Sequence, residues 1–117
     1  MLVQIDHASP VSLGEQVAAN VRRAVAEGTL RKGQRLPAAR ALAKTLNINM
    51  HTVLRGYQIL KDEKLIEMRP GRGAVVTAAA PDRALAVDAC HHFVHLARQA
   101  GLSGPEILSM IEAHLHS

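Results

Sequence analysis

The chain has 117 residues, of which 48% are hydrophobic and 21% charged, and its formal net charge is +4 at pH 7. This length suits one compact domain with a small appendage and leaves no room for a second full domain. The one cysteine, Cys90, excludes an internal disulfide bond and a zinc site built from several cysteines. No apolar run approaches the roughly 18 residues of a membrane span, and no signal sequence is recognisable, so a cytoplasmic protein is expected.

Positive charge is concentrated in the first two thirds of the chain. Residues 1–77 hold 12 Lys and Arg against 6 Asp and Glu, a net charge of +6, whereas residues 78–117 hold 2 against 4, a net charge of −2. A basic module joined to a slightly acidic tail is typical of a protein that binds a polyanion. An ordinary, uneven distribution of surface charges can also produce this asymmetry. We therefore divide the chain into a domain of residues 1–77 and a tail of residues 78–117.

The N-terminal part of the chain predicts one short strand and one helix. Residues 2–5 are β-prone and predict an edge strand. Ser12 and Glu15 have the spacing of a capping box, so a helix is expected to begin there. Valines and alanines then recur on one helical face until Gly28, which ends the helix.

The next stretch predicts two short helices joined by a sharp turn. Pro37 has no N–H group to leave unpaired, so it suits the first turn of a helix. Asn47 tolerates the left-handed conformation that closes a helix, Ile48 can plug the turn into the core, and Asn49 is a good N-cap for the following helix. In that helix the inward face is Val53, Tyr57 and Leu60, and the outward face is His51, Arg55, Gln58 and Asp62.

Two β-prone segments, residues 65–68 and 74–77, flank the sequence RPGRG, which predicts a hairpin turn with Arg69 and Arg72 at its tip. Three helices followed by a basic hairpin is the order of a winged helix-turn-helix. The predicted fold is therefore mainly α with a small β-hairpin, followed by two C-terminal helices. In such a fold one helix fits the major groove of DNA, and the hairpin lies on the backbone or enters the minor groove.

The tail predicts a linker at residues 78–82 and two helices separated by residues 101–105, with Ser103 and Glu106 as a capping box. Its first helix has two apolar stripes, and a two-helix tail cannot bury both faces alone. One face is expected to pack on its own chain and the other on a partner subunit. The first stripe is Leu85, Ala89, Phe93, Leu96 and Ala100, and the second is Val87, Cys90 and Val94. The predicted dimer interface is Leu85, Ala89, Phe93, Leu96, Ile107 and Ile111.

From Pro10 to Thr77 the sequence resembles the DNA-binding domain of GntR-family bacterial transcription regulators. The matching motifs are Gly-x-x-Leu-Pro at residues 33–37, Asn-x-x-Thr-Val-x-Arg-x-Tyr-x-x-Leu at residues 49–60, and RPGRG. The short helical tail is similar to that of the YtrA-like subfamily, in which it serves dimerisation. The resemblance implies a homodimeric transcription regulator, expected to be a repressor, that binds a pseudo-palindromic operator in double-stranded DNA. No cofactor is expected.

The resemblance also implies where DNA would be contacted. Met50 and Leu54 stand where relatives often carry arginine, which leaves the operator sequence open, and Gly56 replaces a more usual alanine. The resemblance assigns DNA contacts to Arg40, Asn49, Thr52, Arg55, Arg72 and Gly73, and position on the recognition helix or the wing adds Met50, His51 and Arg69.

Two alternatives remain open at this stage. His91 and His95 share a helical face and could bind a transition metal, although no carboxylate or second cysteine completes a ligand set. A regulator that responds to a metal or an unidentified small-molecule effector is therefore one alternative, and a winged-helix protein-interaction module without DNA binding is the other. No dinucleotide loop, phosphate loop or nucleophile elbow is present, so an enzyme is not expected.

Overall fold

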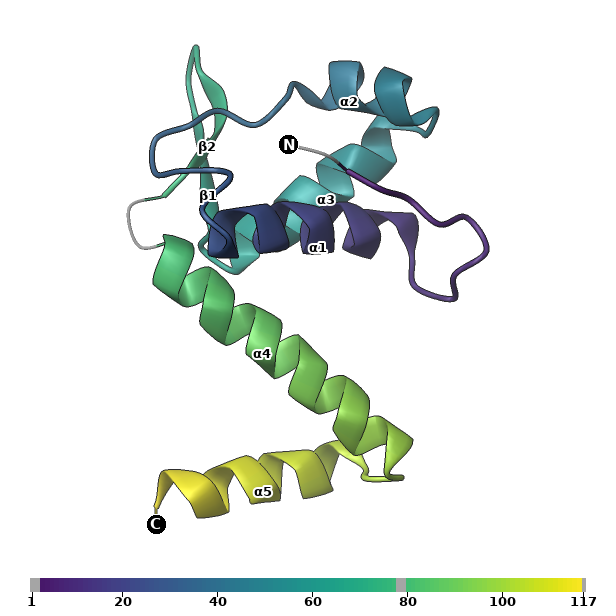
Figure 1. Cartoon of the computed structure of the whole chain (residues 1–117), viewed down its shortest axis with the longest axis vertical. Helices are drawn as coiled ribbons and strands as arrows, with labels where there is room; N and C mark the ends of the chain where they lie inside the picture. Colours follow the sequence, from purple (N-terminus) through teal and green to yellow (C-terminus); the bar gives the residue numbers. More distant parts are fainter. Residues whose placement is uncertain (1–2, 78–79, 117) are drawn as a thin grey trace.

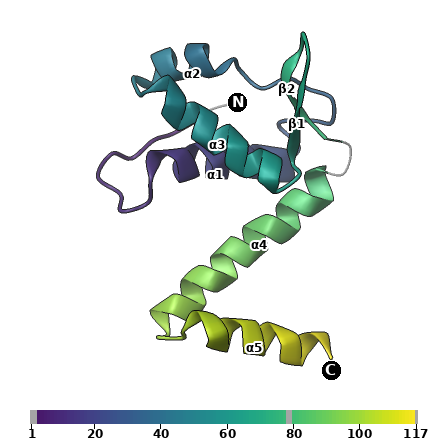
Figure 2. The same cartoon turned by 180° about the vertical axis from the view of Figure 1, so that it is seen from behind.

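The computed structural model describes residues 3–77 and 80–116, and this part of the chain contains five helices and one two-stranded antiparallel sheet (Figure 1). The first three helices and the sheet form one body, from which α4 extends, and α5 turns back at its far end (Figures 1 and 2). The predicted winged helix-turn-helix with two C-terminal helices is confirmed. The elements are α1 Leu13–Ala26, α2 Ala39–Leu46, α3 Met50–Asp62, β1 Ile66–Arg69, β2 Gly73–Val76, α4 Ala80–Gln99 and α5 Gly104–Leu115.

The N-terminal segment is irregular, so the strand predicted at residues 2–5 is wrong for residues 3–5. Residue 2 lies outside the residues that the structure describes. Side-chain amides of α1 occupy the backbone groups that a neighbouring strand would need. Asn20 accepts from the Gln4 N–H at 3.2 Å and donates to the Gln4 carbonyl at 3.0 Å. Gln16 does the same for Asp6, at 2.8 and 3.0 Å. The segment is therefore held against α1 without a sheet.

The start of α2 differs from the prediction. The helix begins at Ala39 with Ala38 as its N-cap, so Pro37 precedes the helix and does not lie in its first turn. The chain is still extended there, because the Leu36 N–H donates to the Ala74 carbonyl on β2 at 2.9 Å. The Tyr57 hydroxyl then donates to the Pro37 carbonyl at 2.7 Å, which attaches the approach to α2 directly to α3.

The turn between α2 and α3 follows the prediction. Asn47 has φ 54° and ψ 49°, the left-handed conformation, and the Ile48 N–H donates to the Ala43 carbonyl at 3.0 Å. Ile48 is half-buried and packs against the core. The Asn49 side chain accepts from the His51 N–H at 2.8 Å, which confirms it as the N-cap of α3.

Helices α1 and α3 cross closely at Gly56. A Cβ atom at this position would lie 2.8 Å from the Gly14 carbonyl oxygen and 2.9 Å from the Val17 Cβ. The crossing explains the glycine at position 56, because a side chain there would not fit. The core around it contains the predicted inward residues Val53, Tyr57 and Leu60, all buried.

The wing is a short hairpin in which Ile66 pairs with Val76 and Arg69 pairs with Gly73. Its turn is closed by the Arg72 N–H, which donates to the Arg69 carbonyl at 3.0 Å, and Gly71 has φ +75° there. The segment before α2 lies along β2, with a bridge between Arg35 and Val75. The wing thus has a third, partial strand that the sequence did not predict.

The tail packs on the body through small residues. Ala80 and Ala84 are fully buried, which lets α4 approach α1 closely. The linker predicted at residues 78–82 is wrong for residues 80–82, which belong to α4, and residues 78 and 79 lie outside the described residues. No residue of either predicted apolar stripe is fully buried against the body. None of the described helices is long and apolar enough to cross a membrane.

The bend between α4 and α5 is built as predicted. Gly101 has φ +86°, and the Ser103 hydroxyl and the Glu106 carboxylate form a reciprocal capping box at the start of α5. These hydrogen bonds from Ser103 lower the pKa of Glu106. Ala97 and Ile107, on either side of the bend, are buried.

Candidate nucleic-acid interface

The exposed face of α3 is the face that the sequence predicted. His51, Arg55, Gln58 and Asp62 are all exposed. The Gln58 amide donates to the Asp62 carboxylate at 2.9 Å, so the C-terminal half of this face is occupied by an internal pair. In the N-terminal half of this face, the side chains of His51 and Arg55 form no hydrogen bond with other described residues. The part of α3 that can bind an external ligand is therefore its N-terminal half.

Three further predicted residues lie at the start of α3. The Asn49 oxygen is used as the helix cap, which leaves the amide NH₂ group of its exposed side chain as a donor. Thr52 is half-buried. Met50 is half-buried as well and packs against the core, so only part of its side chain is accessible.

Arg40 is exposed in the first turn of α2. No side chain caps this helix start, and neither α2 nor α3 has an acidic residue in its first turn. The partial positive charge at the two helix N-termini is therefore not neutralised locally, which favours an anion there.

The aliphatic part of Arg55 rests on the start of α1. Its Cδ lies 3.3 Å from the position of a Cβ at Gly14. A side chain at Gly14 would displace it. The absence of one lets the Arg55 stem lie flat while its guanidinium stays exposed.

The two predicted wing arginines differ in their surroundings. Arg69 donates from Nε to the Glu67 carboxylate at 2.7 Å and forms an ion pair with it, so its charge is partly neutralised. Arg72 is exposed at the tip and forms no ion pair within residues 3–77 and 80–116. Gly73, with φ +78°, begins β2 directly after it. Arg72 is therefore the stronger candidate for an anionic ligand.

A groove of about 230 Å³ lies between α3, the wing and the segment before α2. Leu54 from α3 and Met68 from β1 line it and are 40% and 52% exposed. Arg35 and Arg72 also line it, so cationic side chains flank an apolar surface. The sequence did not single out Arg35 or Met68, because the pairing that brings residue 35 beside the wing spans some 40 positions.

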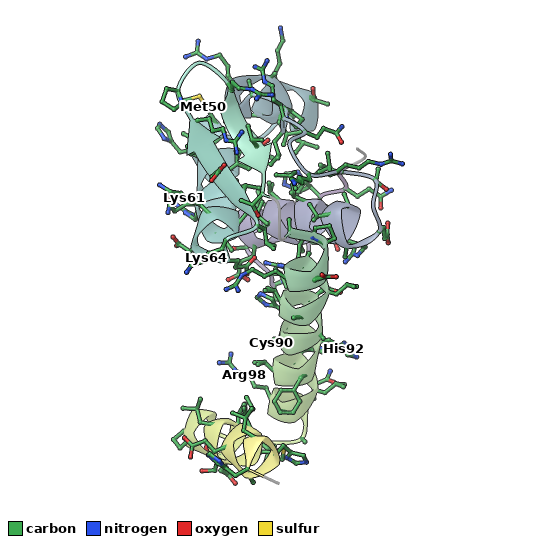
Figure 3. The ribbon with its side chains drawn as sticks, turned by 90° about the vertical axis from the view of Figure 1, so that its left-hand side faces the viewer. Met50, Lys61, Lys64, Cys90, His92 and Arg98 are labelled. Carbon is green, nitrogen blue, oxygen red and sulfur yellow. The ribbon has the colours of Figure 1, made fainter. Side chains whose placement is uncertain are left out.

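The tail histidines do not form a metal site in the structure. Among residues 3–77 and 80–116, no group of three or more His, Cys, Asp or Glu side chains is arranged to hold a metal ion. His91 instead contacts Glu63, with its Nε2 atom 3.1 Å from Oε2. Cys90 and His92 lie on opposite sides of α4 (Figure 3).

Three helices, a hairpin wing and an exposed basic surface between them define a winged helix-turn-helix protein of the nucleic-acid-binding type. The family model of the bacterial regulatory proteins of the gntR family matches residues 13–76. The chain therefore belongs to the GntR family, whose members are transcription regulators and not enzymes.

Individual relatives agree with this family. The chain is 32% identical over 76 residues to the transcriptional repressor YtrA of Bacillus subtilis, and the match covers 65% of the chain and 58% of YtrA. It is 31% identical over 101 residues to the transcriptional regulator Rv1152 of Mycobacterium tuberculosis, with 86% and 84% covered. The solved structure of the GntR-family transcription factor YtrA from Sulfolobus acidocaldarius superposes with a TM-score of 0.63 at 29% identity, covering 97% of both chains.

Proposed function

We propose that this chain is a sequence-specific transcription regulator that binds double-stranded DNA as a homodimer on a pseudo-palindromic operator. The observation that carries the proposal is the groove shared by α3 and the wing, with Arg35 and Arg72 beside it. A helix of α3's diameter fits the major groove of DNA, and a basic hairpin tip suits the flanking phosphates or the minor groove.

The roles of the side chains follow from their positions. His51, Arg55 and the Asn49 amide group are the polar groups at the start of α3 and would face base edges. Arg40 and the uncapped start of α2 would hold a phosphate, and Arg72 another. Thr52, Met50 and Gly73 would line the contact, and Arg69 would contribute less because of its pairing with Glu67.

Relatives support DNA binding and repression. The similar protein from Bacillus subtilis is a transcriptional repressor by name. BusR of S. agalactiae, which shares the fold at a TM-score of 0.61 and 20% identity, has been solved in complex with its busAB-promotor DNA. Repression by occupation of a promoter is the mode of action we propose.

The tail would form the dimer. Leu85 and Leu96 are 57% and 50% exposed on α4, a large apolar surface for a chain of this size. An apolar groove of about 420 Å³ between α4 and α5 is lined by Phe93, Met110, Ile111, His114 and Leu115. Ala89 lies in the same stripe, while Ile107 is 6% exposed and would support the interface from inside the chain.

The test uses duplexes that the wild-type protein selects from random DNA, with binding measured over a salt series. Each phosphate contact that is lost should lower the slope of log K against log salt by about one, so Arg72→Ala should weaken binding to all sequences and reduce that slope. Asn49→Ser keeps an N-capping oxygen but removes the amide donor. It should relax discrimination at one base position, at a cost of about 1–3 kcal/mol.

An interaction module without DNA binding gives the opposite result: the wild type would select no duplex and show no salt-dependent shift. If the wild type binds and both variants bind like it, the roles given to Asn49 and Arg72 are wrong.

A further inference from the structure

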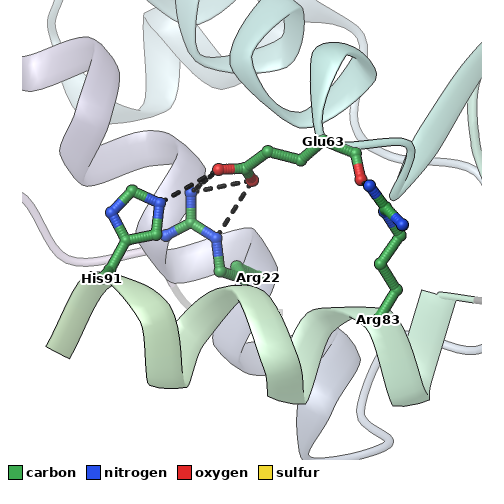
Figure 4. A network of polar contacts seen from close by, with 4 residues as sticks. All are labelled: Arg22, Glu63, Arg83 and His91. Carbon is green, nitrogen blue, oxygen red and sulfur yellow. Dashed lines mark hydrogen bonds and ion pairs between the residues drawn. The ribbon is translucent and has the colours of Figure 1, made fainter. Parts of the chain in front are cut away.

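Four residues interact where α3 ends: Arg22 of α1, Glu63 after α3, and Arg83 and His91 of α4 (Figure 4). Arg22 is 3% exposed and donates to both oxygens of the Glu63 carboxylate. Its terminal nitrogen donates to Oε1 at 2.9 Å and to Oε2 at 2.8 Å, and its Nε donates to Oε1 at 3.1 Å. A buried guanidinium thereby fixes the position of the carboxylate.

The tail contacts the same residue at two points. His91 Nε2 lies 3.1 Å from Glu63 Oε2, and Arg83 Nε donates to the Glu63 backbone carbonyl. His91 and Arg83 are eight positions apart on α4, or roughly 12 Å along its axis at 1.5 Å per residue. Two attachment points at this separation constrain the direction of α4 relative to the body, which one contact cannot do.

Because this cluster lies at the C-terminal end of α3, a small change of angle there displaces the DNA-facing start of the helix. Figure 3 shows Met50, the first residue of α3, at the end of the body far from the tail, and Lys64, just after the helix, near the start of α4. A helix of 13 residues is roughly 20 Å long, so a tilt of about 10° at its C-terminal end moves its start by roughly 3.5 Å. That displacement is about one base-pair step, since ten base pairs span about 34 Å.

We propose that Glu63, Arg83 and His91 form a lock that fixes the angle between the DNA-binding body and the dimerising tail, and so determines which half-site spacing the dimer accepts. The inference rests on the proposed homodimer and its operator. Glu63, Arg83 and His91 are positioning residues, because none of them lies on the DNA-facing surface.

The lock can be opened without disturbing the core. Substituting Arg22 or Glu63 would leave a buried or partly buried charge without its main partner and would destabilise the body itself. Arg83 and His91 are exposed, so Arg83→Met combined with His91→Ala removes both contacts of α4 with Glu63 and leaves the Arg22–Glu63 pair and the packing of Ala80 and Ala84 intact. The matched control is Arg98→Met with His92→Ala on the same helix. These two exposed side chains make no ion pair with the described residues.

The first measurement needs no DNA. A spin label is attached to Lys44→Cys, on the exposed side of α2, in a Cys90→Ser background. Pulsed electron paramagnetic resonance then gives the distance between the labels on the two bodies of the dimer. The wild type and the control should give one narrow distribution. The Arg83–His91 double variant should give a distribution that is shifted, or about twice as wide. Identical distributions for the variant and the wild type would overturn the lock.

The second measurement uses the selected operator with its half-sites moved apart or together by one and two base pairs. Wild type and control should prefer one spacing by about tenfold or more, and the double variant should bind the series within about threefold. A preference as sharp as that of the wild type would contradict the proposal. If the wild type binds no duplex, the proposed function fails, but the distances between the spin labels still test the lock. If the wild type is a monomer, both the proposed function and the lock are overturned.

Discussion

Tyr57 is the single tyrosine of the chain and joins α3 to the segment before α2. Its ring is buried, its hydroxyl donates to the Pro37 carbonyl, and burial raises its pKa from 10.0 to about 12. The native state therefore keeps the phenolic proton to a higher pH than the unfolded chain does. This contribution to stability is complete below about pH 10 and is lost as the pH rises to about 12, a decrease of about 2–3 kcal/mol in the free energy of unfolding.

Tyrosinate absorbance follows this group alone, since the chain has no tryptophan and no second tyrosine. Folded protein should titrate about two pH units above denatured protein. Tyr57→Phe should remove this part of the alkaline loss of stability. At neutral pH it should cost about 1 kcal/mol, because the Pro37 carbonyl loses its donor. A folded-state midpoint near 10 would contradict the expectation.

Leu54 and Met68 give the groove beside the wing an apolar surface. An exposed apolar side chain on a DNA-reading helix suits the methyl group of thymine. If the chain binds DNA as proposed, replacing single thymines of the selected operator by uracil should weaken wild-type binding at one or two positions, by about 1 kcal/mol each.

Leu54→Ala should bind the uracil and thymine duplexes equally at those positions, while thymines elsewhere serve as internal controls. Anisotropy titrations with labelled duplexes measure both. Equal sensitivity to uracil in the wild type and in Leu54→Ala would show that the methyl group is read by another residue.

At the scale of elements, the crossing of α1 and α3 depends on the missing side chain of Gly56. Gly56→Ala would gain about 1 kcal/mol of helix propensity, but its Cβ would meet the Gly14 carbonyl oxygen at 2.8 Å. Backbone cannot yield as a flexible side chain can, so we expect a net loss of about 1–2 kcal/mol in the free energy of unfolding. Urea denaturation measures it.

Gly104→Ala is the matched control, since it lies in the first turn of α5 and a Cβ there has nothing within 4 Å. Its effect should stay within about 0.5 kcal/mol. A Gly56→Ala protein as stable as the wild type would mean that the two helices can move apart at little cost.

Local patterns predicted the helices, their caps and the wing, because Asn49, Ser103 and the RPGRG turn carry their structural reasons within a few residues. The errors arose where distant groups decide. The Asn20 amide replaces a strand partner for the N-terminal segment, and pairing with β2 keeps Pro37 outside the helix. The apolar stripes of α4 suggested a packing face, yet small alanines, Ala80 and Ala84, form it.

The candidate site divides in the same way. The outward face of α3 follows from a 3.6-residue period, and the structure exposes it as expected. Arg35 and the pairing of Arg69 with Glu67 depend on strand neighbours, and Glu63 joins residues 41 and 28 positions away. Long-range pairs of this kind leave no periodic signal in a single sequence.

For the whole molecule, charge and apolar surface are separated between its two parts. The body carries the net charge of +6, and the tail, with a net charge of −2, carries the most exposed leucines of α4 and α5. A polyanion would therefore be attracted to the body, while the tail is suited to an apolar partner. In a dimer joined through the tails, both bodies would present the same basic surface to one DNA duplex.

The last prediction concerns the proposed homodimer. Leu96→Glu places a charge on the exposed stripe of α4, in a side chain that is 50% exposed and does not belong to the body's core. Because burying an unpaired carboxylate in an apolar interface is costly, the variant should sediment as a monomer at concentrations where the wild type is dimeric. Its body should keep the same unfolding curve, and its affinity for the operator should fall by about a hundredfold or more, since the second half-site no longer contributes.

Val11→Glu is the control, because Val11 is 46% exposed but lies outside the tail, and this variant should remain dimeric. Ile107→Ala should behave differently again: that side chain is buried within one chain, so the variant should lose stability of the bend between α4 and α5. Sedimentation velocity separates the three variants. A dimeric Leu96→Glu protein with wild-type affinity would place the interface on another face of the molecule.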